Sequence, residues 1–437
     1  MADLTPAEQL MLELVNRARL DPGAEAKRLG IKLNEGVPKS DKISADSKQV
    51  LAANDLLIDA ARSHSKWMND NDAFSHFQGN KGPTDRMRDA GYVFSGSFAS
   101  GENIAARFQS APITDAQTAR LIVQSYRDLF IDKGIENRGH RTNILSDMFQ
   151  EIGIGQDIGK YRDGGTNWNS SMVTQDFARS GSSVFVTGVV YNDTVKKDDF
   201  FTVGEQRAGV SVRGNGVEDT TGAGGGYELR YDSGGPKDIV FANGVTVSIA
   251  LANRNVKVDL VNGNEIWTST SITAASTQVK EIHALGKDNI DLAGSASAEA
   301  IYGNRGKNIL SGGGGDDSLI GGRGIDKLFG GAGADTFVFA KGDTGKTAAK
   351  ADTIADFSTA DGDVIDLHAW DANSKASGNQ DFTFIGTDSF HRKAGELRAF
   401  ADGGETIIQG DTNGDGKADL VIRLEGNITL TGDSFDL

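Results

Sequence analysis

Apolar residues recur at helical spacing in the first part of the chain. Residues 54–69 and 115–130 each carry such a stripe, and residues 5–8 (TPAE) have the form of a capping box with proline at the first helical position. Residues 151–155 and 171–178 are short runs with the character of strands. The pattern predicts a region of mixed helices and strands up to about residue 180.

The period changes to two between residues 182 and 280. Runs such as VTVSIAL and VKVDLV alternate and are separated by turns rich in Gly, Asn and Asp, so we expect an all-β sandwich of short strands. The stretch VVYNDTVKKDDFFTVGEQRAGVSVR, with GGYEL after it, is similar to the prealbumin-like β-sandwich modules of bacterial surface proteins.

Residues 294–338 repeat with a period of nine residues. The last three units fit G-G-x-G-x-D-x-U-x, where U is a large apolar residue. The eighth positions are Ile301, Leu310, Leu319, Leu328 and Phe337. The sixth positions are Glu299, Asn308, Asp317, Asp326 and Asp335. A flexible glycine-rich linker has no reason to keep an apolar residue in every unit, so we interpret the repeat as a stack of short strands.

The repeat has the residue types of a calcium site. Glycines allow tight turns that expose carbonyl oxygens, and carbonyls with a carboxylate form the oxygen cage that Ca²⁺ prefers. The units resemble RTX repeats, in which two successive units make one coil of a parallel β-roll with ions between the turns. The resemblance implies that Asp317 and Asp335 flank one ion, and that the units of Glu299 and Asn308 bind weakly or cap the roll. The implied calcium ligands are Gly312, Gly313, Gly315, Asp317, Gly321, Gly322, Gly324, Asp326, Gly330, Gly331, Gly333 and Asp335.

Charge concentrates in the last third of the chain. The net charge of the 437 residues is −16, and residues 281–437 contain 26 acidic and 14 basic residues. This balance argues against nucleic acid as a partner and in favour of a cation. The chain has no cysteine, which excludes disulfides. No apolar run approaches the roughly 18 residues of a membrane span, so we expect no transmembrane segment.

The N-terminal sequence MADLTPAEQL has neither the basic nor the apolar region of a secretory signal peptide. RTX proteins leave the cell unfolded through a type I channel with an uncleaved C-terminal signal, and the resemblance implies the same route here. Glycine entropy and carboxylate repulsion would keep residues 281–437 unfolded at low calcium, and extracellular calcium would fold them. We therefore expect an extracellular or surface-associated bacterial protein, with type I secretion machinery as a partner.

The stretches DTIADFSTADGDVIDL and GDTNGDGKADLVIRLEG, both after residue 339, resemble the C-terminal segment that follows the RTX repeats in serralysin-type secreted proteases. The second stretch imitates an EF-hand loop, but Ile422 stands where such a loop needs a bidentate Glu. An extra calcium site and a polar hairpin turn are both open interpretations. The candidate ligands are Asp411, Asn413, Asp415 and Asp419.

Four motifs in the first 180 residues follow one another in a characteristic order: FSH ending at residue 76, GEN from 101, GHR from 139 and VTQDFA from 173. In this order they resemble the CAP superfamily of pathogenesis-related proteins, venom allergens and cysteine-rich secretory proteins, in its cysteine-free bacterial branch. The resemblance implies an α-β-α sandwich with a cleft in which two histidines and two acidic residues converge, with a divalent metal in some members.

The cleft residues carried over by this resemblance are His76, Glu102 and His140. The expected position of the second acid falls near Leu129, and Asp128 or Asp132 is left to replace it. Two neutral imidazoles and a carboxylate suit Zn²⁺ with an open position, where water can be activated. A polar, hydrogen-bonded cleft that stabilises the fold is the alternative, and we interpret His64 as structural.

The sequence contains no H-E-x-x-H, G-x-S-x-G or Walker motif. We expect three domains: a CAP-like domain (1–180), a β-sandwich (182–280), and a β-roll with a secretion segment (281–437). The expected function is a secreted calcium-binding protein whose CAP cleft holds a lipid, protein or divalent metal. The alternatives are an extracellular metal-dependent hydrolase, such as a protease, and a purely structural surface protein.

Overall fold

A computed structural model describes residues 3–437, which form two compact units. The first unit extends to Ala242 and includes Leu251–Gly263, and the second comprises Asn243–Ala250 and Asn264–Leu437. The strands of residues 182–280 are divided between the two units, whereas the sequence pattern predicts a sandwich domain of their own. No helix within residues 3–437 has the length and apolar character needed to cross a membrane.

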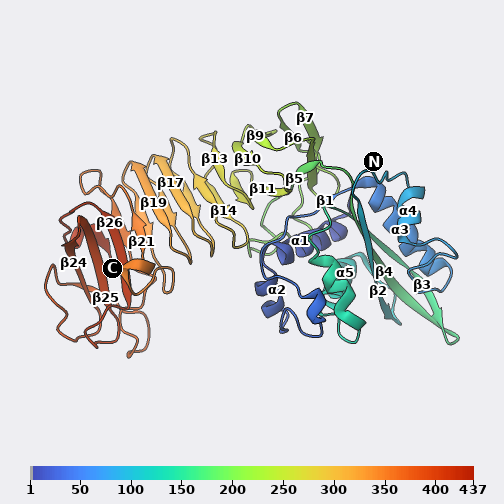
Figure 1. Cartoon of the computed structure of the whole chain (residues 1–437), viewed down its shortest axis with the longest axis horizontal. Helices are drawn as coiled ribbons and strands as arrows, with labels where there is room; N and C mark the ends of the chain where they lie inside the picture. Colours follow the sequence, from blue (N-terminus) through green and yellow to red (C-terminus); the bar gives the residue numbers. More distant parts are fainter. Residues whose placement is uncertain (1–2) are drawn as a thin grey trace. The chain divides into compact units, whose positions relative to one another are not determined.

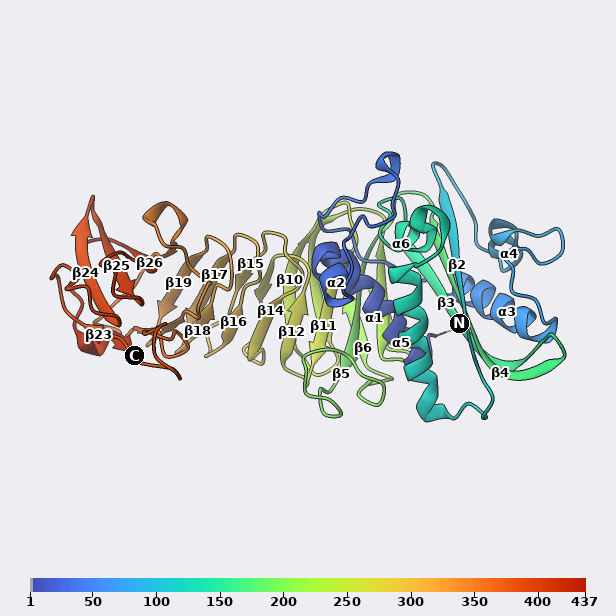
Figure 2. The same ribbon diagram turned by 90° about the horizontal axis from the view of Figure 1, so that it is seen from below.

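The first unit contains a three-layer arrangement of helices around a four-stranded sheet (Figure 1). The strand order is β1 (Ala52–Ala53), β3 (Glu151–Asp163), β4 (Thr166–Arg179) and β2 (Ala99–Gln109). One face carries α3 (Asp55–Asp70) and α4 (Pro83–Asp89). The other face carries α1 (Pro6–Leu20), α2 (Pro22–Arg28), α5 (Asp115–Ile131) and α6 (Gly139–Ile144), as Figure 2 also shows.

The predicted start of the first helix is confirmed in detail. The Thr5 backbone N–H donates to Glu8 Oε2 at 2.9 Å, and the Glu8 N–H donates to Thr5 Oγ1 at 3.3 Å, so the capping box is complete. The helices predicted at residues 54–69 and 115–130 lie within one residue of α3 and α5. The predicted strands are longer than expected, because β3 and β4 form one continuous antiparallel hairpin.

Two glycines let α3 lie directly on β3. A Cβ atom on Gly153 would stand 2.0 Å from the carbonyl carbon of Leu57, and one on Gly155 would stand 2.2 Å from the backbone nitrogen of Arg62. Both contacts are with helix backbone, which cannot move aside as a side chain can. The run EIGIG therefore sets the distance between the helix and the sheet.

The rest of the first unit consists of short strands. β5 (Val184–Tyr191) pairs antiparallel with β8 (Gly226–Tyr231) and parallel with β11 (Val256–Val261). β6 (Ser211–Gly214) pairs antiparallel with β7 (Val217–Thr220) and β9 (Gly235–Phe241). A buried ion cluster ties α1 to β11, since Lys257 Nζ lies 2.9 Å from Glu13 Oε2 and also contacts Asp259.

The second unit is a parallel roll built from two stacked sheets (Figure 2). One sheet contains β12 (Glu265–Thr268), β14 (Glu281–Ala284), β16 (Ala300–Tyr302), β18 (Ser318–Ile320), β20 (Thr336–Val338), β22 (Val364–Asp366) and β27 (Phe435–Asp436). The other contains β13 (Ile272–Ala274), β15 (Asp291–Ala293), β17 (Ile309–Gly314), β19 (Lys327–Ala332), β21 (Asp352–Ile354) and β26 (Leu420–Glu425). β10 (Thr246–Leu251) pairs antiparallel with β13 at the start of the roll. The hairpin of β24 (Glu396–Asp402) and β25 (Glu405–Asp411), with β23 (Thr383–Phe384), extends the second sheet beyond β26.

Apolar ladders fill the roll. The eighth residue of each nonad is fully buried, as the repeat predicts: Ile301, Leu310, Leu319, Leu328 and Phe337. Residues 18 apart face each other on successive strands, so two nonads form one coil. The ladders continue beyond the repeat, where Ile354 pairs with Leu328 and Ile365 pairs with Phe337.

Aromatic rings stack at the beginning of the roll. Trp267, His283 and Tyr302 occupy paired positions on β12, β14 and β16. The ring centroids of Trp267 and His283 are 4.0 Å apart, those of His283 and Tyr302 are 4.2 Å apart, and the rings are nearly parallel. These contacts join three strands independently of any side chain of the calcium motif.

The Gly153 contact generates the first prediction. Gly153→Ala should destabilise the first unit by about 3 kcal/mol, because the added methyl must displace the backbone of α3. Gly139→Ala is the control, since a Cβ there meets nothing within 4 Å. Urea unfolding checks both variants, and similar losses of stability in the two would contradict the close helix–strand contact.

Candidate functional site

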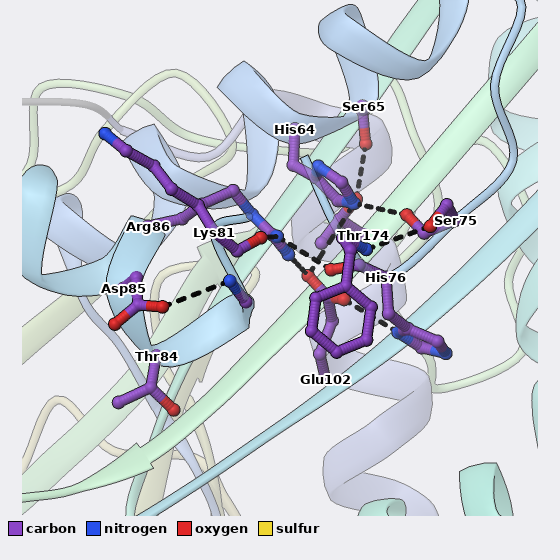
Figure 3. Close-up of polar contacts among 12 residues, drawn as sticks. His64, Ser65, Ser75, His76, Lys81, Thr84, Asp85, Arg86, Glu102 and Thr174 are labelled. Carbon is purple, nitrogen blue, oxygen red and sulfur yellow. Dashed lines mark hydrogen bonds and ion pairs between the residues drawn. The ribbon is translucent and has the colours of Figure 1, made fainter. Parts of the chain in front are cut away.

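His76 and Glu102 form the first pair of the predicted CAP site. His76 lies between α3 and α4, and its Nδ1 is 2.7 Å from Oε1 of Glu102 on β2 (Figure 3). The Glu102 side chain is buried, whereas 43% of the His76 side chain is exposed. The carboxylate therefore orients the imidazole from within the protein and leaves its Nε2 unengaged by Glu102.

Two further side chains, Arg86 and Asp176, lie next to Glu102, and the sequence analysis did not identify either of them. The Arg86 guanidinium on α4 pairs with Glu102 Oε2, and its Nη1 donates to the His76 carbonyl at 2.8 Å. Asp176 lies opposite Glu102 in the β2–β4 register and is fully buried. Burial, together with the charge of Glu102, raises the pKa of Asp176 well above its usual range. Burial therefore favours the neutral form of Asp176.

His64 lies behind this pair, as expected for a structural residue. It is completely buried on α3, and its Nε2 is 2.9 Å from the Ser75 carbonyl (Figure 3). Burial lowers the pKa of His64 to about 4, although Glu102, 4.0 Å away, acts in the opposite direction. The imidazole is therefore neutral at pH 7, and its bond to the Ser75 carbonyl holds the segment that carries His76.

His140 and Asp132 form a second pair of the same kind. His140 Nδ1 lies 2.8 Å from Asp132 Oδ1, and the His140 backbone N–H donates to Asp132 Oδ2 at 2.9 Å. Asp132 is buried at the end of α5, where its left-handed backbone (φ 55°) turns the carboxylate toward α6. Asp128, the other sequence candidate, is 53% exposed and pairs with Arg107 instead.

Asparagines connect the two pairs. Asn143 Nδ2 donates to the Glu102 carbonyl at 3.2 Å, and Asn103 Nδ2 donates to the His140 carbonyl at 3.1 Å. The two asparagine side chains also bond to each other at 3.0 Å. Even so, residues 3–437 include no group of three His, Cys, Asp or Glu side chains arranged to hold a metal ion. The sequence-based set of His76, Glu102 and His140 as joint Zn²⁺ ligands is thus not assembled, because Glu102 is engaged by His76 and Arg86.

The roll presents a second candidate site, made of buried aspartates. Each aspartate accepts a backbone N–H from the preceding coil through Oδ1: Glu299 N–H to Asp317 at 2.8 Å, and Asp317 N–H to Asp335 at 2.9 Å. The other column repeats this, with Asn308 N–H bonded to Asp326 at 2.8 Å. Within the described residues, the second carboxylate oxygen of each aspartate is buried without a hydrogen-bond partner.

The glycines of the motif leave room beside these free oxygens. A Cβ on Gly312 would stand 2.2 Å from Asp317 Oδ2 and 2.5 Å from the Gly330 carbonyl oxygen. A Cβ on Gly330 would likewise stand 2.3 Å from Asp335 Oδ2. A carboxylate oxygen and a carbonyl oxygen of the next coil thus converge on a space that any larger residue would fill. This donor set fits the oxygen coordination of Ca²⁺.

The aspartate columns extend beyond the repeat seen in the sequence. Asp352 accepts the Asp326 N–H at 2.8 Å, and Asp363 accepts the Asp335 N–H at 3.0 Å. Burial raises the pKa of Asp317 and Asp326 to about 7 and that of Asp352 to about 8. Sequence periodicity missed Asp352 and Asp363 because the last coil carries longer turns.

The first coils satisfy their own polar groups. Glu299 Oε1 accepts bonds from the hydroxyls of Ser295 at 2.5 Å and Ser297 at 2.7 Å. Asn308 Nδ2 donates to the Ile290 carbonyl at 2.8 Å, and Asn308 Oδ1 accepts the Asn304 N–H at 2.9 Å. These side chains are therefore hydrogen-bonded within the protein, in contrast to the aspartates of the later coils.

The loop of Asp411, Asn413, Asp415 and Asp419 folds as a polar turn. Asp411 is fully buried, and its carboxylate accepts the backbone N–H groups of Asn413, Gly414 and Gly416. Asp419 pairs with Lys346 at 2.7 Å and accepts a bond from Asn413 Nδ2 at 2.7 Å. These bonds define a compact polar turn, and the extra calcium site at this loop stays a prediction.

The protein thus has two parts. One is an α-β-α arrangement with two histidine–carboxylate pairs, and the other is a parallel roll lined by buried aspartates. Residues 12–177 match the CAP family, described as the cysteine-rich secretory protein family. Residues 307–435 match the serralysin C-terminal family of peptidase M10 proteins. The chain therefore carries a CAP domain and a serralysin-type C-terminal domain, as its motifs predicted.

Two solved structures are similar to parts of the chain. The AlgE6R3 subunit of the Azotobacter vinelandii mannuronan C5-epimerase is 26% identical over 34% of this chain and 78% of its own length, with a TM-score of 0.26. An extracellular protein containing a SCP domain from Bacillus anthracis str. Ames is 23% identical over 41% of this chain and 45% of its own, with a TM-score of 0.24. No curated protein matches the chain significantly.

Burial of neutral His64 predicts an acid-sensitive first unit. The unfolded imidazole takes up a proton below about pH 6.5, whereas the folded one resists until about pH 4, so stability should fall as the pH drops through this window. His64→Gln should remove about 3 kcal/mol of this pH dependence. Urea unfolding at pH 7 and pH 4.5 measures it, with exposed His391→Gln as the control. Equal pH dependence in the two variants would refute the assignment.

Proposed function

We propose that this chain is a secreted calcium-binding protein whose C-terminal roll folds outside the cell around Ca²⁺ and carries a ligand-binding CAP domain. The observation that carries the proposal is the set of buried carboxylate oxygens without partners: Oδ2 of Asp317, Asp326, Asp335 and Asp352. Each is an ionisable oxygen removed from water, and Asp317 and Asp326 each lie beside a glycine that leaves an open space.

The energetics of these carboxylates support calcium-dependent folding. Burying an ionised carboxylate without a counter-charge costs several kcal/mol. Near neutral pH the folded roll must either protonate its aspartates or bring in cations. Ca²⁺ supplies the positive charge, and a carboxylate and a carbonyl of the next coil would hold it without displacing a protein hydrogen bond.

Calcium dependence provides a physical basis for export through a type I channel. A chain that cannot offset its buried carboxylates stays unfolded at the low calcium concentration of a cytosol and folds at the higher concentration outside. The serralysin-type C-terminal domain supports this route, with the secretion machinery as partner, and the CAP domain supports an extracellular location.

For the CAP domain we favour ligand binding over catalysis. His76 is nearly half exposed, and the exposed rings of Phe74 and Phe77 flank it in sequence. Two oriented imidazoles beside apolar surface suit a partner with both polar and apolar groups, such as a lipid or a protein segment. Glu102 and Asp132 position the histidines, and Arg86 pairs with Glu102.

One observation favours a metal-dependent hydrolase as the second candidate. His76 and His140 each bond a carboxylate through Nδ1, which is how outer carboxylates orient metal-ligating histidines. In that case His76 and His140 would bind a divalent ion, and Glu102 and Asp132 would be their orienting groups. A bound ion of this kind can supply a water nucleophile at neutral pH.

The calcium proposal predicts a specific loss in Asp317→Asn with Asp335→Asn. The amide keeps an oxygen for the backbone N–H but replaces the unpartnered oxygen with a group that cannot bind Ca²⁺. Calorimetry should show fewer ions bound per chain. The calcium concentration needed to protect residues 311–338 from hydrogen exchange should rise at least tenfold.

Asp316→Asn with Asp361→Asn is the matched control for this pair. It removes the same charge from exposed positions next to the columns, and its calcium response should stay close to that of the parent chain. An equal response of the two double variants would mean that overall charge, and not the buried oxygens, governs calcium binding.

The metal hypothesis for the CAP domain predicts zinc binding that depends on both histidines. His76→Ala and His140→Ala should each weaken zinc affinity at least tenfold in calorimetry on the calcium-loaded chain. His368→Ala, which removes an exposed histidine from the second unit, should leave it unchanged. Zinc binding that survives in both CAP variants would rule out the metal site and leave the ligand-binding function.

A further inference from the structure

The two turn edges of the roll differ sharply in charge. The turns that lead from the second sheet to the first between β15 and β22 are residues 294–299, 315–317, 333–335 and 355–363, and they contain no Lys or Arg, although the preceding turn of this edge, 275–280, ends with Lys280. Their exposed acidic residues are Asp316, Asp356 and Asp361. The opposite turns, which lead from the first sheet to the second, contain most of the basic residues of the coils.

Basic residues occupy one repeated position on that opposite edge. Each stands three residues after the last residue of a strand of the first sheet, namely β14, β16, β18 and β20. The residues are Lys287, Arg305, Arg323 and Lys341, and Lys307 lies beside Arg305. We call these five residues the basic edge. All are exposed except Lys287, which is partly exposed.

Backbone contacts show that the turns of the basic edge stack on one another. A Cβ on Gly306 would stand 2.3 Å from the Asp288 carbonyl oxygen, and one on Gly324 would stand 2.1 Å from the Gly306 carbonyl oxygen. Successive coils are therefore one strand spacing apart, about 5 Å. The basic side chains form a row that runs along the stacking direction of the roll.

Such a row has an electrostatic cost in the free protein. Like charges on neighbouring strands destabilise a sheet, and a net negative chain has no need of cations for solubility. Acidic residues lie in the same turns as the row. Asp288 lies in one turn and Asp343 in another. Burial raises the pKa of Asp343, and the charge of Arg323 acts in the opposite direction.

The chemistry of the basic edge selects a linear carboxylated polymer. A single row of cations about 5 Å apart matches one chain that carries a charge on each residue, whereas duplex DNA carries a charge every ~1.7 Å along its axis. Single-stranded nucleic acids bind through base stacking on aromatic rings, and residues 285–290, 303–308 and 321–326 contain no aromatic residue.

We propose that the basic edge of the calcium-folded roll binds an acidic polysaccharide of the uronate type, with the sugar chain lying along the row. Arg305 and Arg323 pair with carboxylates on successive sugars, and Lys287, Lys307 and Lys341 extend the contact to both sides. The roll would then hold the protein on an anionic extracellular matrix while the CAP domain stays available.

The test uses the full-length chain in calcium and a soluble oligogalacturonate, with a neutral malto-oligosaccharide of equal length as the reference. We expect binding to the uronate alone, weakening as salt is added. Arg305→Gln with Arg323→Gln and Lys341→Gln should reduce the affinity at least tenfold. The control removes three exposed lysines elsewhere, Lys32→Gln, Lys39→Gln and Lys375→Gln, and should bind like the parent.

Hydrogen-exchange protection of residues 311–338 in calcium reports folding separately, so a failure of the calcium proposal is recognised independently of polymer binding. If the glutamine variant does not fold, a second variant, Arg305→Lys with Arg323→Lys, takes its place. This variant keeps the charge of the row and should retain most of the affinity. Absence of uronate binding by the folded parent, equal losses in both triple variants, or tighter binding of an oligonucleotide would each overturn the proposal.

Discussion

The second unit depends on how a buried carboxylate is balanced. In the parallel roll, one oxygen of each motif aspartate accepts a backbone N–H of the preceding coil, and this bond helps hold the coils in register. The other oxygen faces a space kept open by glycine. The same residue thus joins the coils and brings in a buried carboxyl group, which near neutral pH must be either protonated or balanced by a cation.

The first unit solves the same problem with its own side chains. Glu102 is buried against Arg86 and His76, and Lys257 is buried against Glu13 and Asp259. These charges are balanced by neighbouring side chains within the protein. The ion pairs of the first unit thus contrast with the unpartnered aspartate oxygens of the roll.

Local rules made much of this structure predictable. The capping box of α1, the apolar ladders and the motif aspartates follow from short-range patterns that the structure keeps. The choice of Asp132 over Asp128 depended on a left-handed backbone at the end of α5, which no periodicity reveals. Asp352 and Asp363 were missed because their place in the columns is set by strand pairing across longer turns.

The remaining differences between the expectations from sequence and the structure come from contacts between residues that are distant in sequence. The alternating strands after residue 182 read as a separate module, but pairing distributes them between two units, and alternation alone does not say which neighbour a strand will choose. Arg86 and Asp176 were missed for a related reason. Each matters through a partner far away in sequence, and only the fold brings that partner, Glu102, to them.

In the coils of Glu299 and Asn308, hydrogen bonds within the protein satisfy these two side chains, which bears on the number of ions per roll. Hydroxyls and a side-chain amide make the polar contacts there, and the stacked rings of Trp267, His283 and Tyr302 join the adjacent strands. Under the calcium proposal, the number of ions bound by the roll therefore follows the number of aspartates with an unpartnered oxygen and not the number of coils. A longer roll of this kind can grow by adding coils at its first end without adding to its demand for calcium.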